Sequence, residues 1–187
     1  PLCDVKLSVQ NEILIKHDAL MDGYYKDEEE TNKTIIDGWL HTGDEGIIDA
    51  EGFLKITGRV KDLFKTSKGK YIAPSPIEMK LSANKNIEQV CVVGTELPQP
   101  IAIIVLSERG KGKIEADLIA SLETTLEVVN PKLDSHEKIH NIIVVNEDWT
   151  VENKLLTPTM KIKRNVIEKL YNANYKVWYE GERIIMD

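Results

Sequence analysis

The pattern of hydrophobic residues changes near residue 58, and this change limits the folds open to the chain more than any other feature. Before it, apolar and polar residues alternate over short segments such as Val5–Val9 and Phe53–Thr57, which is typical of half-buried strands in hairpins. After it, the apolar run Ile101–Leu106 indicates a buried strand, and Ile114–Val129 carries apolar residues at helical spacing. We therefore expect an α+β protein in which a β-rich segment precedes a small α+β domain.

The charge of the chain changes at the same place. Residues 1–57 contain 5 Lys and Arg against 13 Asp and Glu, whereas residues 58–187 contain 19 against 18. The two changes together predict two domains, residues 1–58 and residues 59–187. The net charge of the whole chain is −7, which argues against nucleic acid as a partner because that role requires a basic surface.

Cysteine content and the length of the apolar runs restrict the class of protein further. The 2 cysteines, Cys3 and Cys91, form no Cys-x-x-Cys motif, which excludes a disulfide scaffold or a zinc ribbon and favours a reducing, cytoplasmic location. The apolar runs are too short for a transmembrane segment, while peripheral membrane association stays open. The chain starts at Pro1 and opens directly into a hairpin pattern, so we expect a piece of a longer protein.

Local signals predict the remaining elements. A glycine turn between residues 46–49 and 53–57 indicates a hairpin, and the acidic stretch Asp27–Lys33 indicates a short helix. Ser75–Glu78 has the composition of a capping box, with proline at the first helical position, and predicts a helix to about Ser82. A last helix is expected from Arg164 to Tyr171.

Asp44 and Arg59 are the first candidate site residues. A hairpin centred between residues 50 and 51 returns the chain so that Asp44 lies opposite residue 57, close to Arg59. A carboxylate accepts hydrogen bonds from neighbouring hydroxyls, and a guanidinium adds a planar set of donors, so the two side chains suit a diol such as a ribose. The spacing alone favours the alternative, a surface salt bridge at the mouth of a hairpin.

Two later segments carry lysines that suit an anionic ligand. In Ser67-Lys68-Gly69-Lys70, backbone amides and lysines could face a phosphate or a narrow ligand channel, although flexible basic loops are common. Lys161 precedes the last helix on a stretch stiffened by Pro158, where it could act as a catalytic point charge or be an ordinary surface lysine. No metal site is expected, because His136 and His140 have no third ligand nearby.

Three motifs, in this order, carry a resemblance to a known family. Gly38-Trp-Leu-His-Thr-Gly-Asp44, Gly58-Arg-Val-Lys-Asp62 and Leu156-Thr-Pro-Thr-Met-Lys-Ile-Lys-Arg164 together resemble the adenylate-forming (AMP-binding) enzyme superfamily. Residues 153–164 are most similar to its long-chain fatty acyl-CoA synthetases. The resemblance implies that residues 1–58 end the β-barrel-like subdomain of a large N-terminal domain. Residues 59–187 would form the mobile C-terminal domain, an antiparallel sheet with packed helices.

The resemblance also implies roles for the candidate residues. Asp44 and Arg59 would hold the ribose hydroxyls of ATP or acyl-AMP, Lys61 would lie at the hinge, and Lys161 would serve the adenylation step. The loop that shapes the CoA channel would contain Ser67, Lys68, Gly69 and Lys70. The chain departs from the family pattern at three places: lysine at the hinge, Met160 where relatives have glycine, and a basic loop without its usual acid.

The implied activity is that of an AMP-forming acid–thiol ligase that uses ATP, Mg²⁺ and CoA to convert a carboxylic acid, a fatty acid by this resemblance, into its CoA thioester. The Mg²⁺ ligands and the large domain would lie upstream in the same chain, so the isolated piece is expected to be inactive. Two alternatives stay open. One is an adenylating enzyme with another acceptor, such as a carrier protein or, as in luciferases, oxygen; the other is a non-catalytic nucleotide-binding module.

Overall fold

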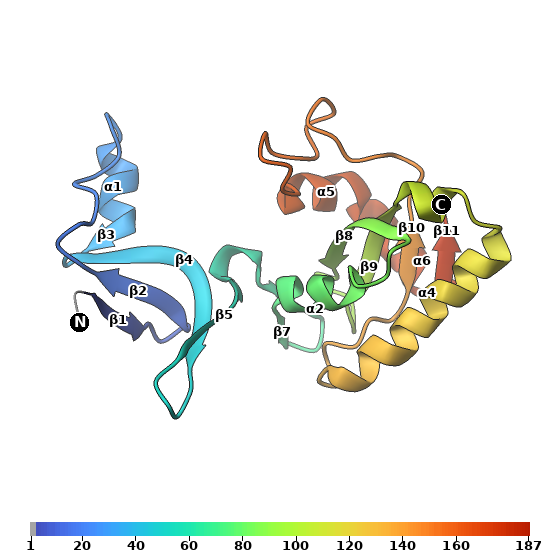
Figure 1. Ribbon diagram of the computed structural model, residues 1–187, viewed down its shortest axis with the longest axis horizontal. Coiled ribbons are helices and arrows are strands. Elements are labelled where there is room, and N and C mark those ends of the chain that lie inside the picture. Colours follow the sequence, from blue (N-terminus) through green and yellow to red (C-terminus); the bar gives the residue numbers. More distant parts are fainter. Residues whose placement is uncertain (1–2) are drawn as a thin grey trace. The chain divides into compact units, whose positions relative to one another are not determined.

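The chain divides into two compact units, with the division between Leu63 and Phe64. The computed structural model describes residues 3–187, and Figure 1 shows the first unit in blue to cyan and the second in green to red.

The first unit is an antiparallel sheet with one short helix. Its strands pair in the order β1-β2-β4-β3, and β5 pairs with the far part of the long strand β4. In the described residues these strands form an open sheet and no closed barrel. The elements are β1 (Asp4–Leu7), β2 (Glu12–Lys16), α1 (Glu28–Thr34), β3 (Ile35–Ile36), β4 (Trp39–Ile48), β5 (Leu54–Arg59) and a 3₁₀ turn (Val60–Asp62).

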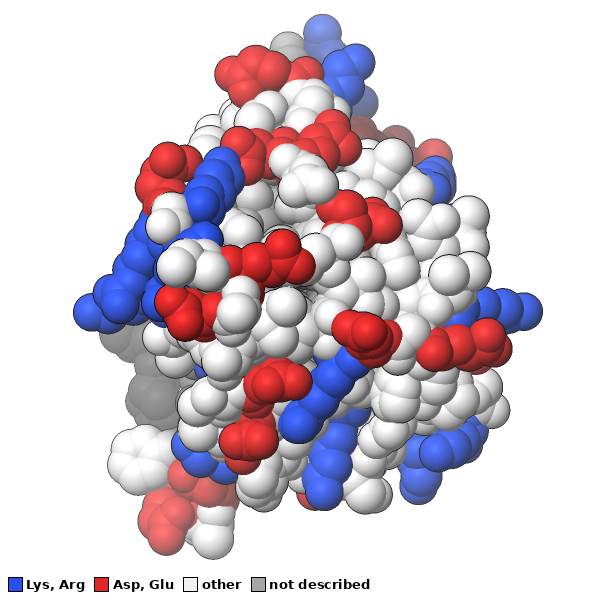
Figure 2. Space-filling model, turned by 90° about the vertical axis from the view of Figure 1, so that its right-hand side faces the viewer, with Lys and Arg blue, Asp and Glu red and all other residues white. Residues whose placement is uncertain are grey.

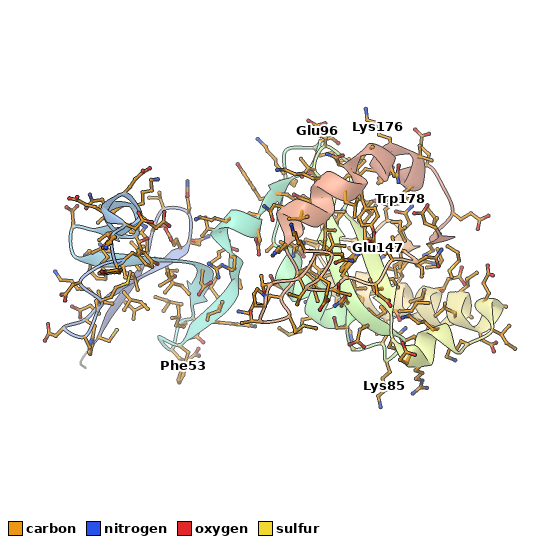
Figure 3. All side chains as sticks on the ribbon, turned by 90° about the horizontal axis from the view of Figure 1, so that it is seen from above. Phe53, Lys85, Glu96, Glu147, Lys176 and Trp178 are labelled. Atoms are coloured by element: carbon orange, nitrogen blue, oxygen red, sulfur yellow. The ribbon has the colours of Figure 1, made fainter. Side chains whose placement is uncertain are left out.

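Local side-chain contacts explain why these elements form where the sequence predicts them. The Asp27 carboxylate caps α1 by accepting a hydrogen bond from Glu30 N at 3.0 Å. In the turn between β4 and β5, the Asp49 carboxylate accepts from Phe53 N at 2.8 Å. Both predicted hairpins and the acidic helix are confirmed. The β4–β5 ribbon exposes apolar side chains, and Figure 3 shows Phe53 at its tip, 71% exposed.

The second unit is built on a mixed four-stranded sheet in the order β11-β10-β9-β8. Strands β8 and β9 are antiparallel, whereas β10 is parallel to both β9 and β11. The elements are β6 (Phe64–Lys65), β7 (Tyr71–Ile72), α2 (Pro74–Leu81), β8 (Ile87–Val93), β9 (Ile101–Leu106), α3 (Glu108–Lys111), α4 (Glu115–Val129), β10 (Ile142–Val144), α5 (Arg164–Tyr171), α6 (Tyr175–Tyr179) and β11 (Ile184–Met186).

The predicted α+β class is confirmed, with one refinement to the sheet. The antiparallel expectation holds for β8 with β9 and for the small hairpin of β6 with β7. It fails for β10 and β11, because each is reached through a long connection that contains helices, and such crossovers produce parallel pairs. The sequence analysis also did not predict α6 and β11.

Helices cover both faces of this sheet. One face packs with α2 and α4 through residues such as Val92, Ile104 and Leu122. The other packs with α5 and α6 through residues such as Ile103, Ile167 and Trp178, the last of which Figure 3 labels within this layer. Burial on both faces explains why β9 and the second half of β8, Val90–Val93, appear in the sequence as continuous apolar runs.

The start of α2 differs from the prediction. The helix begins at Pro74 with Ala73 as its N-cap residue, so Ser75 lies inside the helix, and no side chain caps its first turn. The Glu78 carboxylate instead accepts a hydrogen bond from Val92 N at 2.8 Å and pairs with Arg164. The predicted capping box is therefore wrong, because Glu78 has stronger partners in the tertiary structure than the backbone of its own helix.

The surface of the second unit carries both signs of charge. Figure 2 shows acidic and basic side chains interspersed among uncharged ones over the face in view. Among the helices of the described residues, none combines the length and the apolar composition needed to cross a membrane.

Candidate functional site

Asp44 and Arg59 lie opposite each other at the open end of the β4–β5 hairpin. Their backbones are register partners, and Arg59 Nε lies 3.4 Å from Asp44 Oδ1, with 55% and 35% of the side chains exposed. The predicted proximity is confirmed. The predicted pairing of Asp44 with residue 57 is wrong, because the turn is centred on Glu51 and a bulge adds Thr57 to β5. Both side chains are accessible to a ligand.

Gly43 shapes the segment that presents Asp44. Its φ of +73° lies in the left-handed region, and a Cβ at this position would come within 3.2 Å of a guanidinium nitrogen of Arg59. Its N–H donates a hydrogen bond to Glu12 Oε1 at 2.9 Å. A side chain at residue 43 would therefore strain the backbone and press on Arg59.

Glu12 is a site residue that the sequence analysis missed. One carboxylate oxygen accepts from Gly43 N, and the other lies 2.8 Å from His41 Nδ1. The Glu12 side chain is 16% exposed, and its hydrogen bond to Gly43 N helps to fix the backbone of this turn. No motif marks Glu12, and the two segments lie 31 residues apart in the sequence, so no local signal could have found it.

A pocket of about 420 Å³ opens beside these residues in the first unit. Arg59, Lys33 and Lys61 supply positive charge, and Glu12 and Glu30 supply negative charge. Such a mixed, polar lining suits a polar ligand that carries both an anionic part and hydroxyl groups. The complete lining is Glu12, Tyr24, Glu30, Lys33, Thr34, His41, Thr42, Gly43, Arg59, Val60 and Lys61.

Lys61 lies in the 3₁₀ turn that ends the first unit. The turn spans Val60–Asp62, Lys61 is exposed, and the division between the units follows Leu63. The structure thus places Lys61 close to the point where one compact unit ends, whereas its role as a hinge stays a prediction.

The segment Ser67–Lys70 forms the turn of the β6–β7 hairpin. Thr66 N donates to Lys70 O at 2.9 Å, and Ser67 N donates to Leu97 O at 2.9 Å. Lys68 and Lys70 are exposed. One backbone hydrogen bond therefore closes the loop itself and another joins it to Leu97, while its lysines face water.

Lys161 lies on a second small hairpin. Leu156 and Ile162 form an antiparallel bridge, and Thr157 N donates to Lys161 O at 2.8 Å. Lys161 N in turn donates to Thr157 Oγ1 at 3.1 Å. Because Lys161 itself is exposed, the hairpin backbone decides where its ammonium group can reach.

Met160, directly before Lys161, has a left-handed backbone. Its φ is +61°, and its N–H donates to Thr157 O at 2.8 Å to close the turn. A residue with a Cβ costs about 1–2 kcal/mol in this conformation, which is the physical reason why glycine suits this place in the motif. The Met160 side chain is 65% exposed, so packing offsets little of that cost.

Arg164 is not part of a solvated basic cluster with Lys161 and Lys163. Only 10% of its side chain is exposed, and its Nη2 lies 2.7 Å from Glu78 Oε1. From the sequence, Arg164 is only the last of the nine residues of the third motif, and no role is predicted for it. Its partner Glu78 lies 86 residues away in the sequence, so the contact could not be predicted from spacing.

In the described part of the chain, no three or more His, Cys, Asp or Glu side chains are placed together to hold a metal ion.

Comparison with known sequences identifies the family. A sequence model of the AMP-binding enzyme C-terminal domain matches residues 61–183. The chain belongs to this family. The matched range contains Lys61, the β6–β7 loop and the Lys161 hairpin, while Asp44 and Arg59 precede it.

The relatives with similar sequences include long-chain fatty acid CoA ligases. The long-chain-fatty-acid–CoA ligase FadD15 of Mycobacterium tuberculosis is 30% identical, over 95% of this chain and 32% of its own length. Long-chain-fatty-acid–CoA ligase 5 of Mus musculus is 34% identical, over 92% of this chain and 28% of its own length. The chain thus spans about a third of the length of these relatives.

Solved structures of adenylate-forming enzymes share the fold. The adenylation domain of a carboxylate reductase from Mycobacterium chelonae superposes with a TM-score of 0.80 at 24% identity, over 96% of this chain and 31% of that domain. The corresponding domain from Segniliparus rugosus, in complex with AMP and a co-purified carboxylic acid, has a TM-score of 0.77 at 22% identity, over 95% and 31%. The likeness extends over both units of this chain.

Proposed function

We propose that the chain is the C-terminal part of an ATP-dependent acyl-CoA synthetase, which activates a fatty acid as acyl-AMP and transfers the acyl group to CoA. The observation that carries the proposal is the Lys161 hairpin, in which hydrogen bonds fix the backbone around one exposed lysine. The names of the relatives support the substrate class. The exposed apolar ribbon of β4 and β5 fits a sheet that is covered in the longer protein.

Asp44 and Arg59 are proposed to hold the ribose of ATP and of the acyl-adenylate. The carboxylate of Asp44 accepts hydrogen bonds from the two ribose hydroxyls, and the guanidinium of Arg59 donates to oxygen atoms of the same nucleotide. Their exposure and the adjoining pocket of about 420 Å³ support this role.

Lys161 is proposed to act in the first step, in which the fatty acid carboxylate attacks the α-phosphorus of ATP and pyrophosphate leaves. Its ammonium group neutralises negative charge shared by the attacking carboxylate and the α-phosphate, which is worth about 3–4 kcal/mol in a site without water. In the second step the CoA thiol attacks the acyl carbon, and AMP leaves with the electron pair of the acyl–oxygen bond; by then the rotation of the domain has withdrawn Lys161.

The domain alternation is part of the same proposal. Residues 1–58 end the large domain, and residues 59–187 form the mobile domain, which rotates about Lys61 between the two steps. After rotation the β6–β7 loop, with Ser67, Lys68, Gly69 and Lys70, lines the channel for CoA. A Lys61→Pro variant restricts the backbone to fewer states, so we expect adenylation to persist and thioester formation to fail if the adenylating state is the one retained.

Mg²⁺ accompanies ATP in the proposed reaction, but the described residues offer it no cluster of ligands. We propose that the Mg²⁺ ligands lie in the upstream part of the longer protein, and we derive no step through the metal from this chain.

A second candidate is an adenylating enzyme that passes its acyl group to another acceptor. The observation in its favour is that the structural neighbours include the adenylation domain of a carboxylate reductase. Full-length protein incubated with ATP and a long-chain fatty acid, and then with CoA or with a carrier protein, distinguishes the two. Formation of acyl-CoA supports the first candidate, and acylation of the carrier protein alone supports the second.

The role of Lys161 is tested by Lys161→Ala in the full-length protein, with Lys163→Ala as the matched control on the same hairpin. We expect Lys161→Ala to slow adenylation by about 10²–10³-fold or more, and to spare thioester formation from supplied acyl-AMP. Lys163→Ala should leave both steps near the wild-type rate. Equal losses in both steps would identify Lys161 as a structural residue.

A further inference from the structure

We propose that Arg164 and Glu78 form a clamp that positions Lys161, with Arg164 as a positioning residue that does not itself touch the substrate. The inference rests on the proposed role of Lys161 and adds two residues, Arg164 and Glu78, that would hold Lys161 in place. The clamp joins the first residue of α5, the middle of α2 and the edge of the sheet in the second unit.

Three short contacts define the clamp. Arg164 Nη2 lies 2.7 Å from Glu78 Oε1, and Arg164 Nη1 donates to Val92 O at 2.7 Å. The same oxygen of Glu78 accepts from Val92 N at 2.8 Å. The Arg164 and Glu78 side chains are 10% and 14% exposed, so the ion pair is nearly buried.

The clamp completes the hydrogen bonding of an edge strand. Among the described strands, β8 has β9 on one side and no further strand on the other. The N–H and C=O groups of Val92 are bonded by Glu78 and Arg164, in place of the partner strand that would otherwise be needed. Both charged side chains are thus hydrogen-bonded to the backbone of Val92, which fixes their positions.

Arg164 transmits this fixed position to Lys161 through a short path. It follows Lys161 by three residues, and between them Lys163 N donates to Leu155 O at 2.8 Å. Leu155 and Leu156, at the base of the hairpin, are 4% and 0% exposed. The hairpin is therefore anchored by apolar packing on its first strand and by Arg164 on its second, and only its tip is exposed.

A guanidinium is required for this arrangement. It presents separate N–H groups in a fixed plane to Glu78 and to Val92 O, whereas a lysine at residue 164 cannot reproduce that geometry. Removing one partner from a buried ion pair leaves the other charge uncompensated, so even a conservative change should loosen the anchor.

Helix α2 should move less than the hairpin when the clamp is broken. It has its own anchors in the core, since Ile77 and Leu81 are 1% and 0% exposed. Residues 146–163 contain no helix and no strand longer than a single bridge. Loss of the clamp is therefore expected to displace Lys161 while leaving the β6–β7 loop in place.

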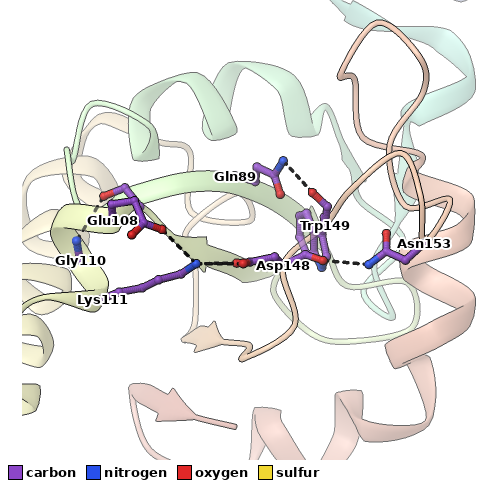
Figure 4. A network of polar contacts seen from close by, with 8 residues as sticks. Gln89, Glu108, Gly110, Lys111, Asp148, Trp149 and Asn153 are labelled. Carbon is purple, nitrogen blue, oxygen red and sulfur yellow. Dashed lines mark hydrogen bonds and ion pairs between the residues drawn. The ribbon is translucent and has the colours of Figure 1, made fainter.

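The second unit offers a matched control in an exposed ion pair. Figure 4 shows Lys111 between Glu108 and Asp148, with Lys111 Nζ 2.9 Å from Asp148 Oδ1 and the two side chains 40% and 55% exposed. This pair ties α3 to the segment after β10, which precedes the hairpin in the chain. Asp148→Asn therefore removes a salt bridge of the same unit without affecting the clamp.

The test uses the full-length protein with Arg164→Lys, Glu78→Gln or Asp148→Asn, and single-turnover assays of each half-reaction. Displacing a catalytic group by about 1 Å can slow a reaction by about 10²-fold. We therefore expect Arg164→Lys and Glu78→Gln to lower kcat for adenylation by about 10–10²-fold with KM for ATP unchanged. Thioester formation from supplied acyl-AMP and the Asp148→Asn variant should stay near wild type.

Hydrogen exchange measured on the same full-length variants gives a readout that does not depend on turnover. We expect faster exchange for residues 155–163 in both clamp variants and no change in α4. If a variant loses adenylation and thioester formation equally, and exchange rises throughout the unit, the pair is merely structural and the proposal is wrong.

The clamp and the proposed function fail in different ways. If Lys161→Ala stops adenylation while the clamp variants behave like wild type in rate and exchange, the clamp proposal is wrong and the function stands. If Lys161→Ala adenylates normally, the role of Lys161 is wrong, whatever the clamp variants do.

Discussion

The two units each contain a pair of an arginine and a carboxylate, and the two pairs differ in almost every other respect. Asp44 and Arg59 lie 3.4 Å apart, and 35% and 55% of their side chains are exposed. Glu78 and Arg164 lie 2.7 Å apart, with 14% and 10% exposed. The same two chemical groups are thus open to a ligand in the first unit and closed to it in the second.

The difference shows that burial, rather than residue type, separates a binding role from a structural one. An exposed pair contributes about 0–1 kcal/mol to stability, because water competes for both partners. A buried pair is costly to break from one side, about 3–5 kcal/mol, because the remaining charge stays in a medium of low polarity. We therefore expect the first pair to matter for ligand binding and the second for the structure around Lys161.

Arg164→Met should have the largest effect on stability. It leaves the Glu78 carboxylate buried beside Val92 without its guanidinium, and we expect the free energy of unfolding of the second unit to fall by about 3–5 kcal/mol. Urea unfolding followed by tryptophan fluorescence measures the change, since Trp149 and Trp178 are buried in this unit. A loss below about 1 kcal/mol, the range of an exposed pair, would remove the contrast between the two pairs.

Gly43→Ala should have an intermediate effect in the first unit. The left-handed backbone at φ +73° costs an alanine about 1–2 kcal/mol, and the new Cβ presses on the guanidinium of Arg59. We expect lower stability together with weaker nucleotide binding in the full-length protein, measured by urea unfolding and by calorimetry with ATP. Gly52→Ala is the control, because its Cβ would meet no atom within 4 Å although its φ is +87°; it should lose stability without losing nucleotide affinity.

The buried residue Tyr175 should make the stability of the second unit depend on pH, an effect that an exposed tyrosine would not have. Desolvation raises the pKa of its hydroxyl, the charges of Glu168 and Cys91 raise it further, and Arg164 lowers it. The folded unit therefore keeps this proton at pH values above 10, the ordinary pKa of a tyrosine, while the unfolded chain releases it. Stability is complete below about pH 10 and falls above it by about 1.4 kcal/mol per pH unit.

The variant Tyr175→Phe should remove the part of the stability loss at alkaline pH that Tyr175 causes. Urea unfolding at several pH values above about 9, just below the ordinary tyrosine pKa, measures this change. Burial also raises the pKa values of Tyr171 and Tyr179, so some loss should remain in the variant. An unchanged slope would show that Tyr175 does not keep its proton in the folded unit.

Asp44→Ala should have the smallest effect on stability and a clear effect on binding. We expect the free energy of unfolding to change by about 0–1 kcal/mol, while the affinity of the full-length protein for ATP falls because both acceptors for the ribose are lost. If ATP affinity survives and thermal stability drops instead, the pair is a salt bridge at a hairpin mouth, and the nucleotide assignment is wrong.

Much of the secondary structure could be predicted from the sequence, because hairpins and helices depend on residues close together in the chain. The two hairpins of the first unit, the buried strand β9, and helices α4 and α5 are confirmed. The approach of Asp44 to Arg59 also followed from one hairpin. The bulge at Thr57 altered only the register, and bulges carry no dependable sequence signal.

The sequence by itself determined the α+β class, the change of pattern near residue 58, the family motifs and the nearness of Asp44 to Arg59, since each depends on composition or on local spacing. Only the tertiary structure decided that Glu78 meets Arg164, 86 residues away, and that Glu12 holds the turn at Gly43, 31 residues away. In both cases a carboxylate that could cap a helix or face water instead accepts a hydrogen bond from a donor in a distant segment. Such a choice depends on which backbone groups the folded sheet leaves without partners, and no local pattern reports that.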